Sequence, residues 1–103
     1  LDPNRSVIEE TLFHEITYQM DELKRITDDL VQIRETLAGM QQVQLDAQLQ
    51  QTADWLFAFR PQGDSHEARK AYLIETRDQA LQLVEELRTT RAALLGSNPS
   101  PAQ

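Results

Sequence analysis

The feature that most constrains the fold is a stripe of apolar residues spaced three or four positions apart in the first 40 residues. The stripe consists of Ile8, Leu12, Ile16, Met20, Leu23, Ile26, Leu30, Ile33, Leu37 and Met40. This spacing puts the side chains on one face of an α-helix, and so narrow a face is typical of a seam between helices. From Met20 onward the alternation is close to a coiled-coil repeat. Ser6 and Glu9 form a capping box at the start of the stripe, so a first helix is predicted over about residues 7–38.

A second helix is predicted after the glutamine-rich run that follows Gly39. Its stripe is out of phase with the first and consists of Leu45, Leu49, Ala53, Leu56 and Phe59. The phase break favours a turn near residues 39–42 and a second helix over about 42–60. One long bent helix is the alternative, because an interior glycine costs a helix only about 1 kcal/mol. Pro61 ends this segment, since proline lacks the N–H that a helix interior needs.

A third helix is predicted over about residues 65–95, with Asp64 as its N-cap and Gly96 as its stop. Residues 97–103 contain two prolines and small polar residues, and we expect a flexible tail there. Residues 1–96 are predicted to form a single helical domain. The predicted fold class is all-α and coiled-coil-like, with helix pairing between chains. It consists of three antiparallel helices of unequal length, long, short and long, or of one long bent helical hairpin.

The unequal helix lengths predict self-association. At 1.5 Å per residue the three helices are roughly 48, 27 and 46 Å long. If both connections are tight turns, the short second helix leaves apolar residues uncovered at both ends, and a second chain is the simplest cover. We therefore expect a homodimer or a higher homo-oligomer. The residues predicted to self-associate are Ile8, Leu12, Phe13, Ile16, Met20, Leu87, Leu94 and Leu95.

An aromatic corner precedes Pro61, where three of the six aromatic residues fall within five positions of the sequence WLFAF. Side chains at successive positions of a helix point in different directions, so a single groove cannot bury all of these rings. One interpretation is that the rings seal the core against Tyr72, Leu73 and Met20. The other is that Trp55 or Phe57, with Arg60 beside them, docks a protein partner, because Trp, Tyr and Arg dominate binding hot spots.

Charge and composition exclude several classes of function. The chain carries 17 acidic and 10 basic residues, for a formal net charge of -7, which disfavours binding to nucleic acid or to an anionic membrane. The acidity is concentrated between residues 7 and 38, where eight acids face three bases. The absence of cysteine removes disulfide and thiolate chemistry and fits the cytoplasm or another reducing compartment.

Potential chemical sites are sparse. Glu10 and His14 are spaced for one helix face, but two ligands are too few for a metal site. Glu75 and Asp78 resemble half of the acidic pattern of all-helical nucleotide pyrophosphohydrolases, and the other half is absent. No catalytic residue, metal site or cofactor is therefore predicted.

The length and the three-helix plan resemble a spectrin-type repeat. Such repeats usually carry a tryptophan in the first helix, where this chain has Tyr18 and Met20, so no family is assigned. The predicted function is a non-enzymatic helical oligomerisation and protein-binding module, an adaptor or scaffold that self-associates and docks a partner protein. The alternatives are a small acidic chaperone that shields a partner helix and, less favoured, an all-helical enzyme with a site between subunits.

Overall fold

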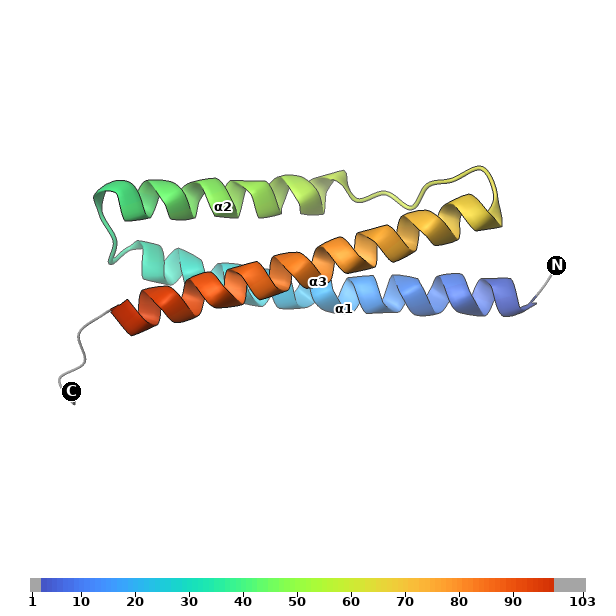
Figure 1. Cartoon of the computed structure of the whole chain (residues 1–103), viewed down its shortest axis with the longest axis horizontal. Helices are drawn as coiled ribbons and strands as arrows, with labels where there is room; N and C mark the ends of the chain where they lie inside the picture. Colours follow the sequence, from blue (N-terminus) through green and yellow to red (C-terminus); the bar gives the residue numbers. More distant parts are fainter. Residues whose placement is uncertain (1–2, 98–103) are drawn as a thin grey trace.

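The computed structural model describes residues 3–97, and the side chains of residues 7–96. Within this range the chain forms three helices, α1 (Pro3–Arg34), α2 (Gly39–Ala58) and α3 (His66–Ser97), and no strand (Figure 1). The prediction of an all-α fold with three helices is confirmed. Of the predicted tail, residues 98–103 lie outside the described range.

The first turn lies earlier than predicted, at residues 35–38. The backbone N–H groups of residues 35, 36 and 37 each donate to the carbonyl three positions back, which tightens the end of α1. Gln42 Nε2 donates to the carbonyls of Arg34 and Leu37, at 3.3 Å each. Gly39 has a φ of 62°, a left-handed conformation that favours glycine. The alternative of one long bent helix is therefore wrong.

Helices α1 and α3 lie side by side along most of their length, and α2 packs along one side of this pair (Figure 1). α1 and α3 run in the same direction, whereas α2 runs back between the two connections. The described chain measures 61 × 26 × 15 Å between its Cα extremes. Its Cα radius of gyration is 17.3 Å. About 13 Å is usual for a compact domain of this size, so the bundle is elongated.

The core has two parts along the bundle. The larger part joins all three helices and consists of Leu23, Ile26, Leu30, Leu45, Val84 and Leu87. The smaller part joins α1 to α3 near their N-terminal ends and consists of Leu12, Ile16 and Leu73. The apolar stripe of α1 thus supplies residues to both parts.

The expectation that Leu12, Ile16 and Leu87 lie uncovered is wrong, because all three are buried within the chain. It assumed a tight turn after α2, but residues 59–65 form an extended connection instead. Seven extended residues reach up to about 25 Å. α1 is 12 residues longer than α2 (32 − 20), or about 18 Å, so the connection can carry the chain back to the start of α1. α3 therefore begins beside the first turns of α1 and covers them.

The extended connection is anchored by aromatic rings. The ring of Phe59 lies between Phe13 of α1 and Tyr72 of α3, with centroids 6.1 Å from each, and it is nearly parallel to the ring of Tyr72. The Tyr72 hydroxyl also accepts a hydrogen bond from the Arg60 backbone N–H at 3.2 Å. Phe59 thus contributes to the seal that one interpretation expected of the aromatic corner.

Candidate functional site

Helix α2 carries two stripes of side chains on different faces. The inner stripe of Leu45, Leu49, Thr52 and Leu56 faces the bundle: Leu45 and Thr52 are buried, and Leu49 and Leu56 are half-buried. The second stripe, which we call the outer stripe, is spaced alternately three and four residues apart. It consists of Met40, Val43, Ala47, Gln50, Asp54 and Phe57, all of them exposed. This spacing is that of a helix–helix seam, but no described element covers it.

Three large apolar side chains of the outer stripe project into solvent. Phe57 is 81% exposed, Met40 is 68% exposed and Val43 is 61% exposed. Single exposed apolar residues are common on protein surfaces and need no explanation. Here three of them share one seam of one helix, which makes this seam the candidate interaction surface.

Charge is scarce on α2. It contains two acidic residues, Asp46 and Asp54, and no lysine or arginine. Asp46 is engaged by Arg34 of α1 in a two-pronged contact, with Arg34 Nη2 3.0 Å from Asp46 Oδ2. Asp54 accepts a hydrogen bond from Gln50 Nε2 at 2.9 Å. Depletion of charge is typical of the core of a protein–protein interface, so the outer stripe is suited to one.

The structure separates the three residues predicted to dock a partner. Trp55 is half-buried between α2 and α3, where its Nε1 donates to Gln79 Oε1 at 2.9 Å. Arg60 Nη1 donates to the carbonyls of Phe57 and Phe59, at 2.9 and 2.7 Å, which satisfies backbone groups at the end of α2. Of the three, only Phe57 belongs to the outer stripe, and its side chain is 81% exposed.

Met40 and Val43 were missed as site residues because the predicted turn was too late. Placing it at residues 39–42 assigned Met40 to the stripe of the first helix. The signal that could have found them was Gly39, which starts α2 rather than interrupting α1. Counted from Gly39, the spacing through Met40, Val43 and Ala47 to Phe57 is visible in the sequence.

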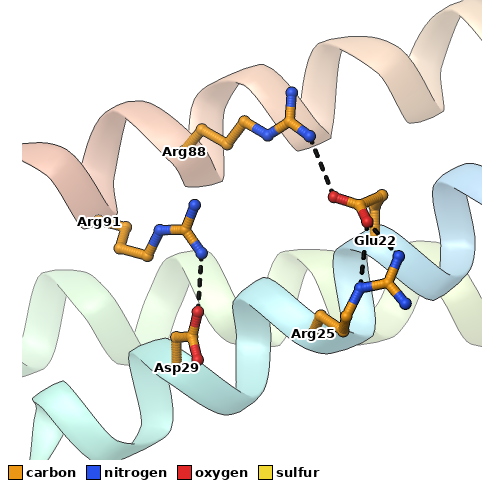
Figure 2. Close-up of polar contacts among 5 residues, drawn as sticks. All are labelled: Glu22, Arg25, Asp29, Arg88 and Arg91. Atoms are coloured by element: carbon orange, nitrogen blue, oxygen red, sulfur yellow. Dashed lines mark hydrogen bonds and ion pairs between the residues drawn. The ribbon is translucent and has the colours of Figure 1, made fainter.

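The acidic side of α1 is occupied by α3. Glu15, Glu22 and Asp29 recur at intervals of seven residues on α1, and each contacts an arginine of α3. Figure 2 shows two of these contacts, Arg88 Nη2 to Glu22 Oε2 at 3.0 Å and Arg91 Nη1 to Asp29 Oδ2 at 2.7 Å. The third joins Arg77 Nη1 to Glu15 Oε2 at 3.3 Å. Exposed pairs of this kind add little stability. They do favour one register between the parallel helices, and they engage three of the eight acids that lie between residues 7 and 38.

A polar cluster joins the start of α3 to the first turns of α1. Glu9 Oε2 lies 2.8 Å from His66 Nδ1, and Glu9 Oε1 accepts a hydrogen bond from Arg69 Nε at 2.8 Å. His66 is buried. Hydrogen bonds from Arg69 and then from His66 hold the pKa of Glu9 below its ordinary value of 4.5. Glu9 therefore acts between helices, rather than in the capping box predicted at the start of α1.

Glu9 is expected to make the stability of the fold depend on pH. A carboxylate with a lowered pKa stabilises the fold fully above its unfolded-state pKa and loses that contribution as the pH falls through the folded-state value. Glu9→Gln should therefore destabilise the protein at pH 7 and have less effect well below pH 4.5. Thermal unfolding followed by circular dichroism at several pH values measures this, with Glu10→Gln, an exposed neighbour, as the control. An equal effect of Glu9→Gln at pH 7 and at pH 2 would contradict it.

A groove of about 320 Å³ lies between α1 and α3 near their N-terminal ends. Its apolar lining includes Ile8 and Ile74, and its charged lining includes Lys70, Glu15 and Arg77. Of the other residues predicted to self-associate, Met20 and Leu94 pack against the core, and Phe13 and Leu95 are partly exposed at separate places. The exposed members of that set therefore form no single surface.

The residues considered for metal binding do not converge. Glu10 Oε1 lies 3.7 Å from His14 Nε2, and both side chains are more than two-thirds exposed. In the part of the chain that the structure describes, no group of three or more His, Asp or Glu side chains could hold a metal ion. None of the described helices combines the length and the apolar character that crossing a bilayer requires.

No protein-family model, curated protein or solved structure matches this chain.

Proposed function

We propose that this chain is a non-enzymatic helical oligomerisation and protein-binding module, an adaptor whose docking surface is the outer stripe of α2. The observation that carries the proposal is the 81% exposure of Phe57 on the same seam as Met40 and Val43. A helix of another chain packed on this seam would pair with α2 as a coiled-coil strand does. The chain has no cysteine, so its fold and its association do not depend on disulfides. This fits a protein of a reducing compartment.

The energetic reason is the burial of apolar surface. Full burial of a side chain such as Phe, Met or Val is worth about 1.5–3 kcal/mol. Association also costs translational and rotational freedom, so three such residues support a reversible contact rather than a permanent one. The flanks of α2 add glutamine and alanine side chains, which are uncharged and can be covered at little electrostatic cost.

The proposed surface for self-association is therefore the side of the bundle formed by α2, and not the ends of the bundle. Two of the eight residues predicted to self-associate, Leu12 and Ile16, are buried in contact with α3. The outer stripe is exposed without any opening of the core. A partner protein with an apolar helix would bind the same surface in competition with a second copy.

The test is the mass of the protein in solution across dilution, measured by sedimentation equilibrium. We expect the mass of the wild type to rise above that of one chain with concentration, and Phe57→Ser to weaken association by at least tenfold, equivalent to about 1.4 kcal/mol. Tyr18→Ser, which removes an exposed aromatic residue from α1, is the matched control and should associate as the wild type does. A wild type that stays monomeric at millimolar concentration, or a Phe57→Ser variant that associates normally, would overturn the proposal.

A further inference from the structure

We infer that the outer stripe of α2 binds the outer stripe of a second copy of this chain, antiparallel, about a two-fold axis that passes between Ala47 and Gln50. The inference rests on the proposed function and adds the identity and the direction of the bound helix. It is drawn from the order of side chains along the stripe, from the distribution of charge and from the position of Asp54.

The order of side chains makes the stripe complementary to itself when one copy is reversed. The spacing along the stripe reads 3, 4, 3, 4, 3 in either direction. Reversal about the proposed axis sets Met40 against Phe57 of the other copy at both ends of the seam. At the centre it sets the small Ala47 against the longer Gln50. The large apolar side chains of Met40 and Phe57 therefore meet at the two ends of the seam. At its centre, where the helices are closest, the small Ala47 faces the longer Gln50.

Charge favours a second copy on this face over the side where α1 meets α3. Each copy carries a net charge of -7, so two copies repel each other unless they meet where acids are few. The flanks of the outer stripe carry four uncharged exposed residues, Gln44, Gln51, Ala53 and Ala58, and one acid, Asp46, which is paired with Arg34 of the same chain. The side of the bundle where α1 meets α3 carries the ion pairs that join these helices. The outer stripe, with Asp54 as its one acid, is a surface on which two acidic chains can approach.

Asp54 decides between the two directions. In a parallel pair the two Asp54 carboxylates would lie side by side in the seam, and like charges so close oppose pairing. In the antiparallel pair each Asp54 faces Val43 of the other copy, and the two carboxylates lie about 16 Å apart along the axis, beyond the screening length of about 8–10 Å. Each carboxylate keeps its hydrogen bond from Gln50 of its own chain.

Asp54 also limits the strength of the dimer, because a carboxylate is partly desolvated against an apolar Val43. Asp54→Asn should lower the dimer dissociation constant several-fold in sedimentation equilibrium. Asp21→Asn, which makes the same change of net charge at an exposed position of α1, should leave it nearly unchanged. If Asp54→Asn weakens the dimer, Asp54 faces a cation and not Val43, and the inferred pairing is wrong.

Disulfide cross-linking tests the direction, since the chain has no cysteine of its own. Chains bearing Val43→Cys and chains bearing Asp54→Cys, distinguished by a mass tag, are oxidised separately and as a mixture and then separated without reductant. We expect a covalent dimer only in the mixture, and always of one chain of each kind. Covalent dimers in the separate samples would indicate parallel pairing.

The outcomes separate the inference from the function on which it rests. Suppose that the wild type associates and that this association depends on Phe57. Cross-links within the separate samples, or no cross-link in the mixture, would then overturn the antiparallel pairing but not the docking surface. A wild type that never associates would remove both.

Discussion

Replacing Ile16 by alanine is expected to lower the free energy of unfolding by about 2–5 kcal/mol. Ile16 is fully buried against Leu12 and Leu73 in the smaller part of the core, so truncation leaves a cavity between α1 and α3. A domain of this size has only about 5–15 kcal/mol of stability in total. The midpoint of thermal unfolding should fall by at least about 8 °C, which circular dichroism measures directly.

The dependence of this loss on concentration tells where Ile16 is buried. If α3 of the same chain covers it, the loss is the same at micromolar and millimolar protein. If a second chain covers it, as the unequal helix lengths predicted, the loss depends on protein concentration by mass action. The matched control is Ile8→Ala on the same helix, where the side chain is 40% exposed and the cost should be much smaller. Equal losses for the two variants would contradict the packing of α3 over α1.

The second large effect is expected at Gly63, in the connection between α2 and α3. Gly63 has a φ of 138°, which side chains rarely tolerate, and a Cβ there would lie 2.6 Å from the backbone nitrogen of Arg69. Such backbone conformations cost a residue other than glycine about 1–3 kcal/mol before any clash is counted. Gly63→Ala should therefore displace the connection from the first turn of α3 and destabilise the protein by more than that amount.

Gly39→Ala is the matched control for Gly63→Ala. Gly39 also has a left-handed φ, but a Cβ there would meet nothing within 4 Å. Its cost should be near 1–2 kcal/mol, that of the backbone conformation alone. Urea unfolding of both variants gives the comparison, and the Tyr72 ring, which stacks on Phe59, offers a local spectroscopic signal. A Gly63→Ala variant as stable as Gly39→Ala would mean that the connection does not hold α3 in register.

The helical character of the chain could be predicted because it depends on neighbours in sequence. The stripe through Leu23, Ile26 and Leu30 has a period that only a helix satisfies, and these residues are buried. Proline and glycine at positions 61 and 63 marked the second break for equally local reasons. The helix ends were harder to predict. Ser6 and Glu9 matched a capping box, yet α1 begins at Pro3. Proline is favoured at the first helical position, and that signal was present but not weighed.

The candidate site was only partly predictable. Phe57 was named as a docking residue, and the structure leaves it exposed. Trp55 was named beside it, but a hydrogen bond to Gln79 and packing against α3 occupy it. These side chains are two positions apart on a helix, and the sequence around them does not say which one faces α3. Which of the two side chains is covered depends on the position of α3, and contacts between residues far apart in the sequence set that position.

What the sequence by itself determined is the all-α fold class, the apolar stripes and the surplus of acid on the first helix, because each of these follows from the pattern within one segment. Only the tertiary structure decided that α3 returns to the start of α1 and covers Leu12 and Ile16. That outcome depends on the extended path of residues 59–65, whose ends are held by Phe59 packing between Phe13 and Tyr72 and by Glu9 binding His66 and Arg69. These contacts join residues up to 60 positions apart, and periodicity within one helix carries no information about them.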